Sequence, residues 1–283
     1  MGGEEVPSSR GMGRMEQTPV AISICSTEPE SWDTIWKWSW FCRDFWWEGY
    51  RREAETAVAD LFAFLRTRSV RSVLDCACGL GMKTILFAEQ GYEVEGADAS
   101  AVAAEYAPKL AAEKGLGIRF IHARNEELGQ KCGRTYDCVF SDGFDELATH
   151  EALVCSARGI YAVLNDGGIL VFSGIAPEWS ESDLQAVIDK EWQEREPFVV
   201  LAPFERDGVR LTELEVDERT PEGILEKRIF LIEEEGALRA EIALLMNRRK
   251  WAFRDLDKVL TAAGFRSVST EKTGTTLFTV AVR

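Results

Sequence analysis

Residues 73–81 read Val-Leu-Asp-Cys-Ala-Cys-Gly-Leu-Gly, and this stretch decides the fold. Its apolar start is typical of a buried strand, and its two glycines allow the backbone to approach a ligand closely before a helix begins. The first turn of a helix carries unpaired N–H groups and favours negative charge. The segment therefore predicts a strand, a bend and a helix that bind the carboxylate end of a cofactor or a pyrophosphate.

An acidic residue at the end of the next predicted strand supports this interpretation. Asp98 follows the apolar run 92–97, and its carboxylate could accept hydrogen bonds from both hydroxyls of a ribose. The alternative is that Asp98 only caps the helix that follows. A dinucleotide-binding fingerprint needs a third glycine, and Thr84 stands at that position, which weakens a nicotinamide cofactor without excluding it.

Short apolar runs alternate with helical patterns through the middle of the chain. The runs fall at residues 72–76, 92–97, 118–122, 137–141 and 168–173. A helix is predicted at 148–164 and ends at the turn 165–168, and Ser180 with Asp183 resembles a capping box before another helix. Such alternation predicts an α/β fold in which a parallel sheet is covered on both faces.

The N-terminal part differs in composition from this alternating region. Residues 1–28 are rich in Gly, Ser, Glu and Pro and read as a mobile leader without chemistry. Residues 29–70 hold six of the nine tryptophans, of which Trp32, Trp36 and Trp40 would share one helical face, and an amphipathic helix is expected at 52–66. We expect a Trp-rich helical lid that packs on the core.

The C-terminal part changes character again. Residues 198–247 contain three strand-like runs separated by Gly-containing turns, which predicts an antiparallel β meander. A helix at 253–263 should stop at Gly264, and two further strands within 265–282 would complete the central sheet. The expected organisation is a cofactor-binding core at 71–197, the meander at 198–247, and the end of the core at 248–283.

Composition limits the class of partner. The chain has 283 residues and a formal net charge of −15, so an extended nucleic acid is a disfavoured partner. No apolar run reaches the roughly 20 residues of a membrane-spanning helix, and the first 30 residues lack the apolar centre of a signal peptide. We therefore expect a cytoplasmic protein that does not enter a membrane.

The cysteines do not indicate a structural framework. The seven cysteines form an odd, scattered set, which is not typical of disulfide pairing, so reduced thiols are expected. Cys76 and Cys78 are too close together for a zinc knuckle, and the chain has only two histidines. No metal site is predicted.

From Asp75 to Ser100 the sequence resembles the first two motifs of class I S-adenosylmethionine-dependent methyltransferases, and is particularly similar to the glycine and glycine/sarcosine N-methyltransferases. Counterparts continue at Arg52 with Glu55, at 136–139, at 164–170, in the meander and at 262–265, so the resemblance covers most of residues 45–283. It implies a Rossmann-like sheet of seven strands in the order 3-2-1-4-5-7-6, mostly parallel, with the cofactor across the carboxyl ends of the strands.

The resemblance also implies a set of cofactor contacts. S-adenosylmethionine would be the cofactor and S-adenosylhomocysteine the product, with Asp98 on the ribose, the glycines around the methionine part, Arg52 or its neighbour Arg51 on the carboxylate, and Asn125 near the adenine. The residues expected to bind the cofactor are Arg52, Asp75, Ala77, Gly79, Gly81, Asp98, Ala99, Arg124, Asn125 and Ser141.

Departures from the family pattern concern the acceptor. The glycine methyltransferases place an arginine after the fifth strand for the substrate carboxylate, and this chain has Ile175 there; residues 143–145 likewise replace a Gly-Asn-Ser segment. Glycine itself is therefore an unexpected substrate. The substrate contacts implied are Trp36, Trp40, Phe144 and Ile175. The tryptophans either form an aromatic cage for a cationic or apolar acceptor or pack as a lid.

The expected reaction is methyl transfer to a small molecule, with an amine favoured over a hydroxyl or another nucleophile. Positioning and exclusion of water can supply most of the acceleration. A base helps only where the acceptor must lose a proton, and His150, Asp145 and Glu146 are the candidates. The alternatives are a protein that binds S-adenosylmethionine for another reaction or as a structural subunit, and an NAD(P)-dependent reductase. The oligomeric state stays open, with a homodimer as one option.

Overall fold

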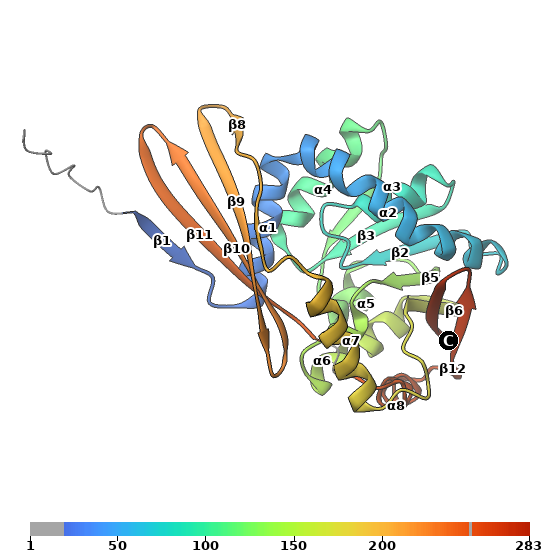
Figure 1. Ribbon diagram of the computed structural model, residues 1–283. Helices are drawn as coiled ribbons and strands as arrows, with labels where there is room; N and C mark the ends of the chain where they lie inside the picture. Colours follow the sequence, from blue (N-terminus) through green and yellow to red (C-terminus); the bar gives the residue numbers. More distant parts are fainter. Residues whose placement is uncertain (1–19, 249–250) are drawn as a thin grey trace, which may run out of the picture.

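The computed structural model describes residues 20–248 and 251–283, and contains two sheets with helices around them (Figure 1). Most of the predicted leader, residues 1–19, lies outside the described residues. The central sheet has seven strands in the order β12-β13-β6-β5-β2-β3-β4. Counted from β2, this is the predicted order 3-2-1-4-5-7-6, so the expected Rossmann-like α/β fold is confirmed.

The strands of the central sheet come from the predicted apolar runs. They are β2 (Ser72–Cys76), β3 (Glu93–Asp98), β4 (Arg119–His122), β5 (Tyr136–Ser141), β6 (Leu164–Ser173), β12 (Ser267–Thr273) and β13 (Thr276–Val282). Strands β2 to β6 pair in parallel, whereas β13 pairs antiparallel with both β6 and β12. All five residues of β2 are buried, because helices cover both faces of a central parallel strand.

Helices cover both faces of this sheet. On one face α6 (His150–Ala162) and α8 (Phe253–Ala263) bury Leu153 and Leu256 in one apolar cluster. On the other face, α3 (Met82–Glu89), α4 (Ala101–Glu113) and α2 (Arg43–Arg66) form a second cluster. Short helical turns follow β4 and β5, namely η1 (Asn125–Glu127), α5 (Leu128–Lys131) and η2 (Phe144–Glu146).

The predicted turn at 165–168 is a break inside a strand. Strand β6 begins at Leu164 beside Tyr136, and the next paired residues are Ile169 and Cys138, so the register shifts over the intervening segment. Gly167 in this segment has a φ of 78°, a value that favours glycine. The turn residues therefore form an irregularity of the sheet where a separate loop was expected.

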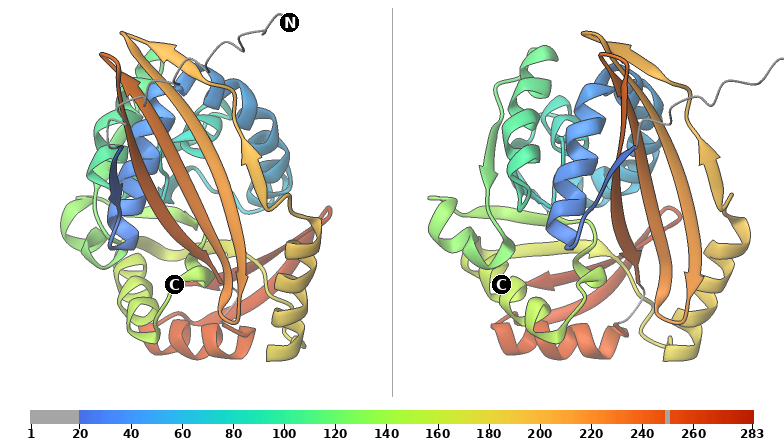
Figure 2. Two further views of the ribbon diagram at one scale, coloured as in Figure 1. Left: turned by 60° about the vertical axis from the view of Figure 1, so that its left-hand side comes forward. Right: turned by 90° about the vertical axis from the view of Figure 1, so that its left-hand side faces the viewer.

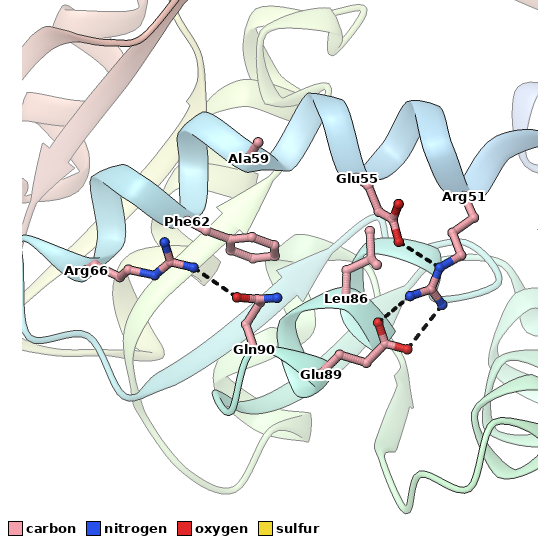
Figure 3. A pocket seen from close by; sticks show the side chains of 8 residues that line it. All are labelled: Arg51, Glu55, Ala59, Phe62, Arg66, Leu86, Glu89 and Gln90. Carbon is pink, nitrogen blue, oxygen red and sulfur yellow. Dashed lines mark hydrogen bonds and ion pairs between the residues drawn. The ribbon is translucent and has the colours of Figure 1, made fainter.

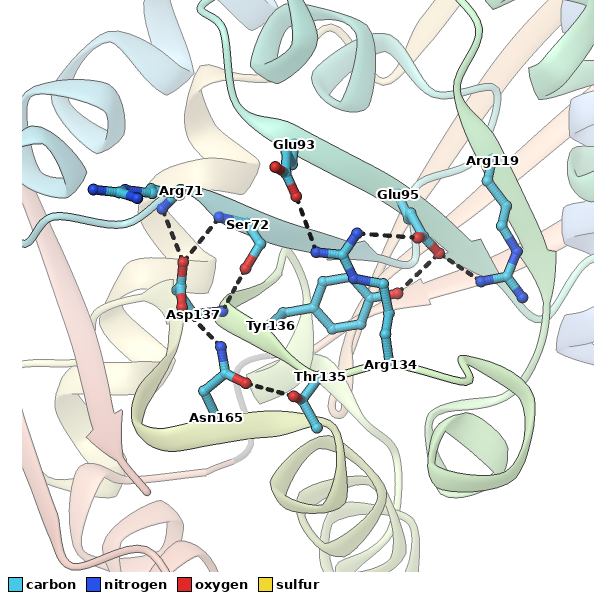
Figure 4. Close-up of polar contacts among 10 residues, drawn as sticks. All are labelled: Arg71, Ser72, Glu93, Glu95, Arg119, Arg134, Thr135, Tyr136, Asp137 and Asn165. Carbon is cyan, nitrogen blue, oxygen red and sulfur yellow. Dashed lines mark hydrogen bonds and ion pairs between the residues drawn. The ribbon is translucent and has the colours of Figure 1, made fainter.

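Polar side chains tie together the amino ends of the central strands (Figure 4). The carboxylate of Asp137 accepts hydrogen bonds from the backbone N–H groups of Arg71 and Ser72, both at 3.0 Å, and from the Asn165 amide at 2.8 Å. Nearby, the Tyr136 hydroxyl donates to Glu95 at 2.9 Å. This network lies at the amino ends of the strands, and the glycine segment follows the carboxyl end of β2. The network is therefore expected to stabilise the fold and not to contact a ligand of the glycine segment.

The second sheet contains the predicted meander. Its strands are β1 (Ala21–Ile24), β7 (Phe198–Val200), β8 (Phe204–Arg206), β9 (Val209–Thr220), β10 (Gly223–Glu234) and β11 (Ala237–Asn247). The path is β1-β11-β10-β9-β7, with β8 also on β9, and β9, β10 and β11 are antiparallel. Residues 21–24 were expected within a mobile leader; they pair in parallel with β11 instead, from Ala21 beside Arg239.

Two N-terminal helices connect the sheets. Helix α1 (Glu28–Phe41) lies between the meander and the core, because Trp38 stacks on Phe230 of β10 while Trp40 stacks on Tyr106 of α4. Helix α2 starts earlier than the predicted residue 52. Helix α7 (Glu181–Glu194) begins with the expected capping box, in which Ser180 and Asp183 bond each other's backbone. The views in Figure 2 show the long meander strands at the front of the molecule.

Candidate cofactor site

The glycine segment after β2 forms the bend that the sequence predicts. Ala77, Gly79 and Gly81 all have positive φ values, of 58°, 54° and 83°, and Gly81 is the N-cap of α3. The first turn of α3 contains no acidic side chain, so the positive end of the helix is left for an external anion. The bend thus presents backbone N–H groups at the carboxyl edge of the sheet.

Asp98 closes the site from the end of β3. Its Oδ2 accepts the backbone N–H of Gly79 at 2.8 Å, and its Oδ1 accepts that of Ser100 at 2.8 Å. Burial raises the pKa of the Asp98 carboxyl, while the two N–H groups oppose that shift. The structure brings the predicted bend and the predicted acid together, and the helix cap is Ser100, whose Oγ accepts the N–H of Ala103 at 3.0 Å.

Helix α1 covers this bend. A Cβ atom added to Gly79 would lie 2.5 Å from Cζ2 of Trp36, so the indole rests on the glycine backbone. The Ser100 hydroxyl donates to the Asp33 carboxylate of the same helix at 2.5 Å. Asp33 was not among the residues that the sequence singled out, because its role depends on how α1 docks. Helix α1 therefore packs directly on the bend and on Ser100, as the predicted lid requires.

Three further polar groups lie around the bend. Asp75 is buried and accepts the Thr84 hydroxyl at 2.6 Å, and burial raises the pKa of Asp75 to about 7. Lys83, in the first turn of α3, pairs with Asp142, which follows β5. Ser141, at the end of β5, is buried beside Cys76. Lys83 was missed by the sequence analysis, although a cation close after a glycine bend was a usable signal.

Arg52, which the resemblance places at the cofactor carboxylate, lies on α2. It is exposed on α2, and its neighbour Arg51 bonds Glu55 at 2.8 Å and Glu89 at 2.7 Å (Figure 3). These residues line a depression of about 330 Å³ between α2 and α3. Because Glu55 and Glu89 hold the Arg51 guanidinium beside the far end of α3, Arg51 is engaged away from the glycine bend, and the contact of Arg52 with the cofactor carboxylate stays a prediction.

The residues expected near the adenine lie on the neighbouring loops. Ala99 is exposed, and its carbonyl oxygen is 3.0 Å from Nε2 of His122. The side chain of Arg124 is 63% exposed. The backbone of Asn125 packs against α6, where a Cβ atom on Gly159 would lie 1.9 Å from the Asn125 carbonyl oxygen. All three flank the ends of β3 and β4, beside Asp98.

The expected substrate residues divide into two groups. Trp36 lies on the bend, and Trp40 stacks on Tyr106 with centroids 4.9 Å apart, so both rings of α1 pack on the core. Phe144 and Ile175 are core residues, 1% and 4% exposed, and they belong to the same apolar cluster of the central sheet. Both side chains pack inside that cluster, and their contact with the acceptor stays a prediction.

The three expected bases follow β5. Asp145 is buried, whereas Glu146 is exposed in the same short turn η2. His150 is the exposed first residue of α6, with its ring 6.3 Å from that of Trp251. They therefore lie on one segment after the carboxyl end of the sheet, at different depths.

A polar cluster on the meander faces the same side as α1. Nη1 of Arg228 donates to Glu213 at 2.9 Å and also to Glu215, so two carboxylates share one guanidinium. Burial raises the pKa of Glu213, and it raises the pKa of Tyr50 on α2, which lies within reach of Arg228. The sequence analysis missed this cluster, although the alternation of Glu with apolar residues in β9 was the available signal.

Aromatic rings connect this cluster to the glycine bend. The ring of Tyr50 is 6.0 Å from that of Trp46, and Trp46 is 6.5 Å from Trp36, which rests on Gly79. One apolar wall therefore extends from the cofactor bend to a pair of carboxylates that carries net negative charge.

The site fits S-adenosylmethionine in two respects. Each oxygen of the Asp98 carboxylate accepts one backbone N–H and keeps a second lone pair, which a ribose hydroxyl can use. The first turn of α3, which contains no acidic side chain, provides the positive end of a helix for the carboxylate of the methionine part.

Comparison with known proteins agrees with this geometry. Residues 73–168, which include the glycine bend, Asp98 and the predicted bases, match the family model described as "Methyltransferase domain". No curated protein is similar enough to this chain to count as a match.

Three solved structures illustrate the shared fold. DesVI from Streptomyces venezuelae has a TM-score of 0.58 and 19% identity over 85% of this chain and 96% of that chain. The sugar N-methyltransferase KedS8 from Streptoalloteichus has a TM-score of 0.54 and 20% identity over 83% of this chain and 85% of that chain. The amino pentose methyltransferase CalS10 from Micromonospora echinaspora has a TM-score of 0.53 and 20% identity over 81% of this chain and 91% of that chain. Its structure contains S-adenosylmethionine.

Three further findings on the described part of the chain concern membranes, metals and disulfides. Within residues 20–248 and 251–283, no helix combines the length and apolar character needed to cross a membrane. In the same ranges no group of His, Cys, Asp and Glu side chains is arranged to hold a metal ion. All seven cysteines are free.

Proposed function

We propose that this chain, a class I S-adenosylmethionine-dependent methyltransferase, transfers the methyl group of its cofactor to an amine nitrogen of a small molecule. One observation carries the proposal: the Gly79 N–H and the Asp98 carboxylate meet at 2.8 Å on the carboxyl edge of the sheet. In a Rossmann-like sheet the ends of the first two strands at this edge form the binding crevice for an adenosyl group.

The chemistry needs little covalent help from the protein. When bound, the cofactor supplies a methyl group on a positively charged sulfur. The bend and the first turn of α3 hold the polar end of the ligand, and Asp98 orients its sugar. Trp36 covers Gly79 and Trp46 packs edge-on against Trp36, so these rings exclude water from the bend, and an acceptor held beside them would be close to the reacting carbon.

Charge on the meander supports an amine as the acceptor. Glu213 and Glu215 share Arg228, which leaves the cluster with net negative charge at the end of the aromatic wall. Carboxylates and indole faces both attract ammonium groups. Two of the similar structures carry titles that name a sugar N-methyltransferase and an amino pentose methyltransferase, which supports an amino-bearing acceptor.

An ammonium group must lose its proton before its nitrogen can attack. His150, Asp145 and Glu146 are the proposed bases, because they follow β5 at the carboxyl edge where the acceptor would lie. Glycine itself is not proposed as the substrate. Ile175 is buried where the glycine methyltransferases have an arginine, so no cation stands there for an amino-acid carboxylate. The proposed likeness to that subgroup is thus limited to the cofactor half.

The test has two stages. Calorimetry with S-adenosylmethionine, S-adenosylhomocysteine and NADH should show binding of the first two only, whereas binding of NADH alone would favour a reductase. A mass-shift screen of small amines, phenols and acids with enzyme and S-adenosylmethionine should then give products 14 Da heavier, roughly one methylene unit, among the amines. Products only among the phenols or acids would contradict the amine, and cofactor binding without any product would favour a non-methylating role.

A further inference from the structure

The side of the meander that faces away from α1 is apolar and lies outside the proposed catalytic site. Leu211, Phe230 and Ile232 point toward α1 and are buried, so the alternate residues of these strands point to the opposite, outer face. We define the outer face by one row of paired residues across five strands. The row is Ile24, Ile242, Ile229, Leu214 and Val200.

Every side chain in this row is aliphatic, and the edges of the face are widely open. Ile24 of β1 is 61% exposed and its neighbour Ile22 is 63% exposed, while Phe198 and Val200 of β7 are 59% and 53% exposed at the opposite edge. Contiguous exposed apolar surface of this kind is rare on soluble monomers and marks an interaction site.

No helix of the described residues covers this face. In Figure 1 the sheet stands at the left of the molecule and all labelled helices lie to its right. In Figure 2, where this side comes forward, β9, β10 and β11 lie in front. The outer face is therefore an apolar sheet surface on which no second layer of the described residues packs.

The charge of the outer face differs from that of the whole chain. Its charged side chains form pairs: Lys227 with Glu218 at 2.6 Å, and Arg210 with Glu233 at 4.0 Å and Glu205 at 3.7 Å. Two cations thus meet three carboxylates, so this face is close to neutral although the chain carries −15. Two copies can approach each other here without the repulsion that would act over the rest of the surface.

The size of the face suits a dimer. The long strands have 11 or 12 residues. At about 3.3 Å per residue the long strands are about 40 Å long, and at about 4.8 Å between strands the five-strand row is about 20 Å wide, so the face covers up to about 800 Å². A stable protein interface needs about 800 Å² from each partner.

We propose that the outer face binds the outer face of a second copy of this chain, so that two meanders pack face to face across a two-fold axis. One patch then serves both partners, as a two-fold interface requires. An anionic membrane is a poor alternative because the face has no excess of cations. This inference does not depend on the proposed reaction, since the outer face and the cofactor bend lie on opposite sides of the meander.

The test is the mass of the full chain in solution by light scattering at micromolar concentration. The wild type should have twice the mass of one chain. Ile242→Glu, in the middle of the row, should give a monomer, or weaken the dimer at least about tenfold. Ile24→Lys, at the open edge, should weaken it with little effect on folding. Trp179→Glu, a charge at an exposed aromatic residue outside the face, is the matched control and should remain a dimer.

Circular dichroism and calorimetry with S-adenosylhomocysteine should show that the variants are folded. A monomeric wild type would overturn the proposal. If removal of residues 1–19 then gave a dimer, the occupant of the face would be that segment; if it did not, the occupant would be another partner. A dimer that survives both substitutions would also overturn it, because the interface would then lie elsewhere.

Discussion

The indole of Trp36 lies on the backbone of Gly79, and the N–H of that glycine donates to the Asp98 carboxylate at 2.8 Å. The lid, the glycine bend and the acid therefore meet at one residue. A cofactor that binds between Asp98 and the first turn of α3 would therefore lie beside the same indole.

Gly79→Ala should disrupt this contact. The added methyl group would lie 2.5 Å from the indole, and the φ of 54° is unfavourable for alanine. Since left-handed strain costs about 1–3 kcal/mol, we expect S-adenosylmethionine to bind at least about tenfold more weakly by calorimetry. Gly91→Ala is the matched control, because Gly91 has a φ of 87° with no atom near its Cβ position. Equal affinities for the two variants would contradict the contact.

Trp40→Ala separates the lid from a substrate cage. Trp40 stacks on Tyr106 with an interplanar angle of 8°, so its removal should destabilise the protein by about 1–3 kcal/mol. The KM for the methyl acceptor should stay unchanged in steady-state kinetics. Trp36→Ala should instead weaken cofactor binding. An increased acceptor KM in Trp40→Ala at unchanged stability would support the cage.

Asp75 should make stability depend on pH. Burial raises its pKa from 3.8 to about 7, so its stabilising contribution is full below about pH 4 and is lost as the pH rises through 7. Asp75→Asn removes this loss. The stability of the variant relative to the wild type should increase by up to about 3–4 kcal/mol between pH 4 and pH 8, measured by urea unfolding. Parallel pH profiles would show that Asp75 is ionised throughout.

Asp137 should have the opposite dependence. Burial alone would raise its pKa, yet the N–H groups of Ser72 and Arg71 lower it below the usual value. Its contribution is therefore present above about pH 3.8 and is lost as the pH falls through the lowered pKa. Asp137→Asn should cost about 1 kcal/mol at pH 7 in urea unfolding, and less near pH 3. Asp166→Asn, at a fully exposed side chain, should have no effect at either pH; a cost at Asp137 that grows in acid would be inconsistent with this account.

The sequence predicted those elements whose signals are local. The strand at 72–76 and the helix at 253–263 coincide with β2 and α8, and the capping box at Ser180 is present, because burial, apolar periodicity and caps act within a few residues. The pairing of β1 with β11 joins Ala21 to Arg239, and no local pattern specifies a contact over that separation.

In the site, too, the sequence predicted the part that local signals and sheet topology determine. The bend and Asp98 lie in consecutive strand–helix units, so the topology of a parallel sheet brings them together. Arg52, Phe144 and Ile175 were placed by resemblance alone; Arg52 is exposed on α2 and the other two are buried in the core, and their ligand contacts stay predictions. The cluster at Arg228 depends on how the meander docks on α1 and α2, which composition and spacing do not determine.

The most direct test of the central claim is calorimetric titration of S-adenosylmethionine into the wild type, Asp98→Asn and Glu105→Gln, the last being a control at an exposed carboxylate of α4. The account predicts that Asp98→Asn binds at least about tenfold more weakly, a loss of about 1.4 kcal/mol, because the ribose loses a charged acceptor. Glu105→Gln should bind like the wild type. Equal affinity in Asp98→Asn and the wild type would contradict the claim that the bend and Asp98 form the adenosyl site.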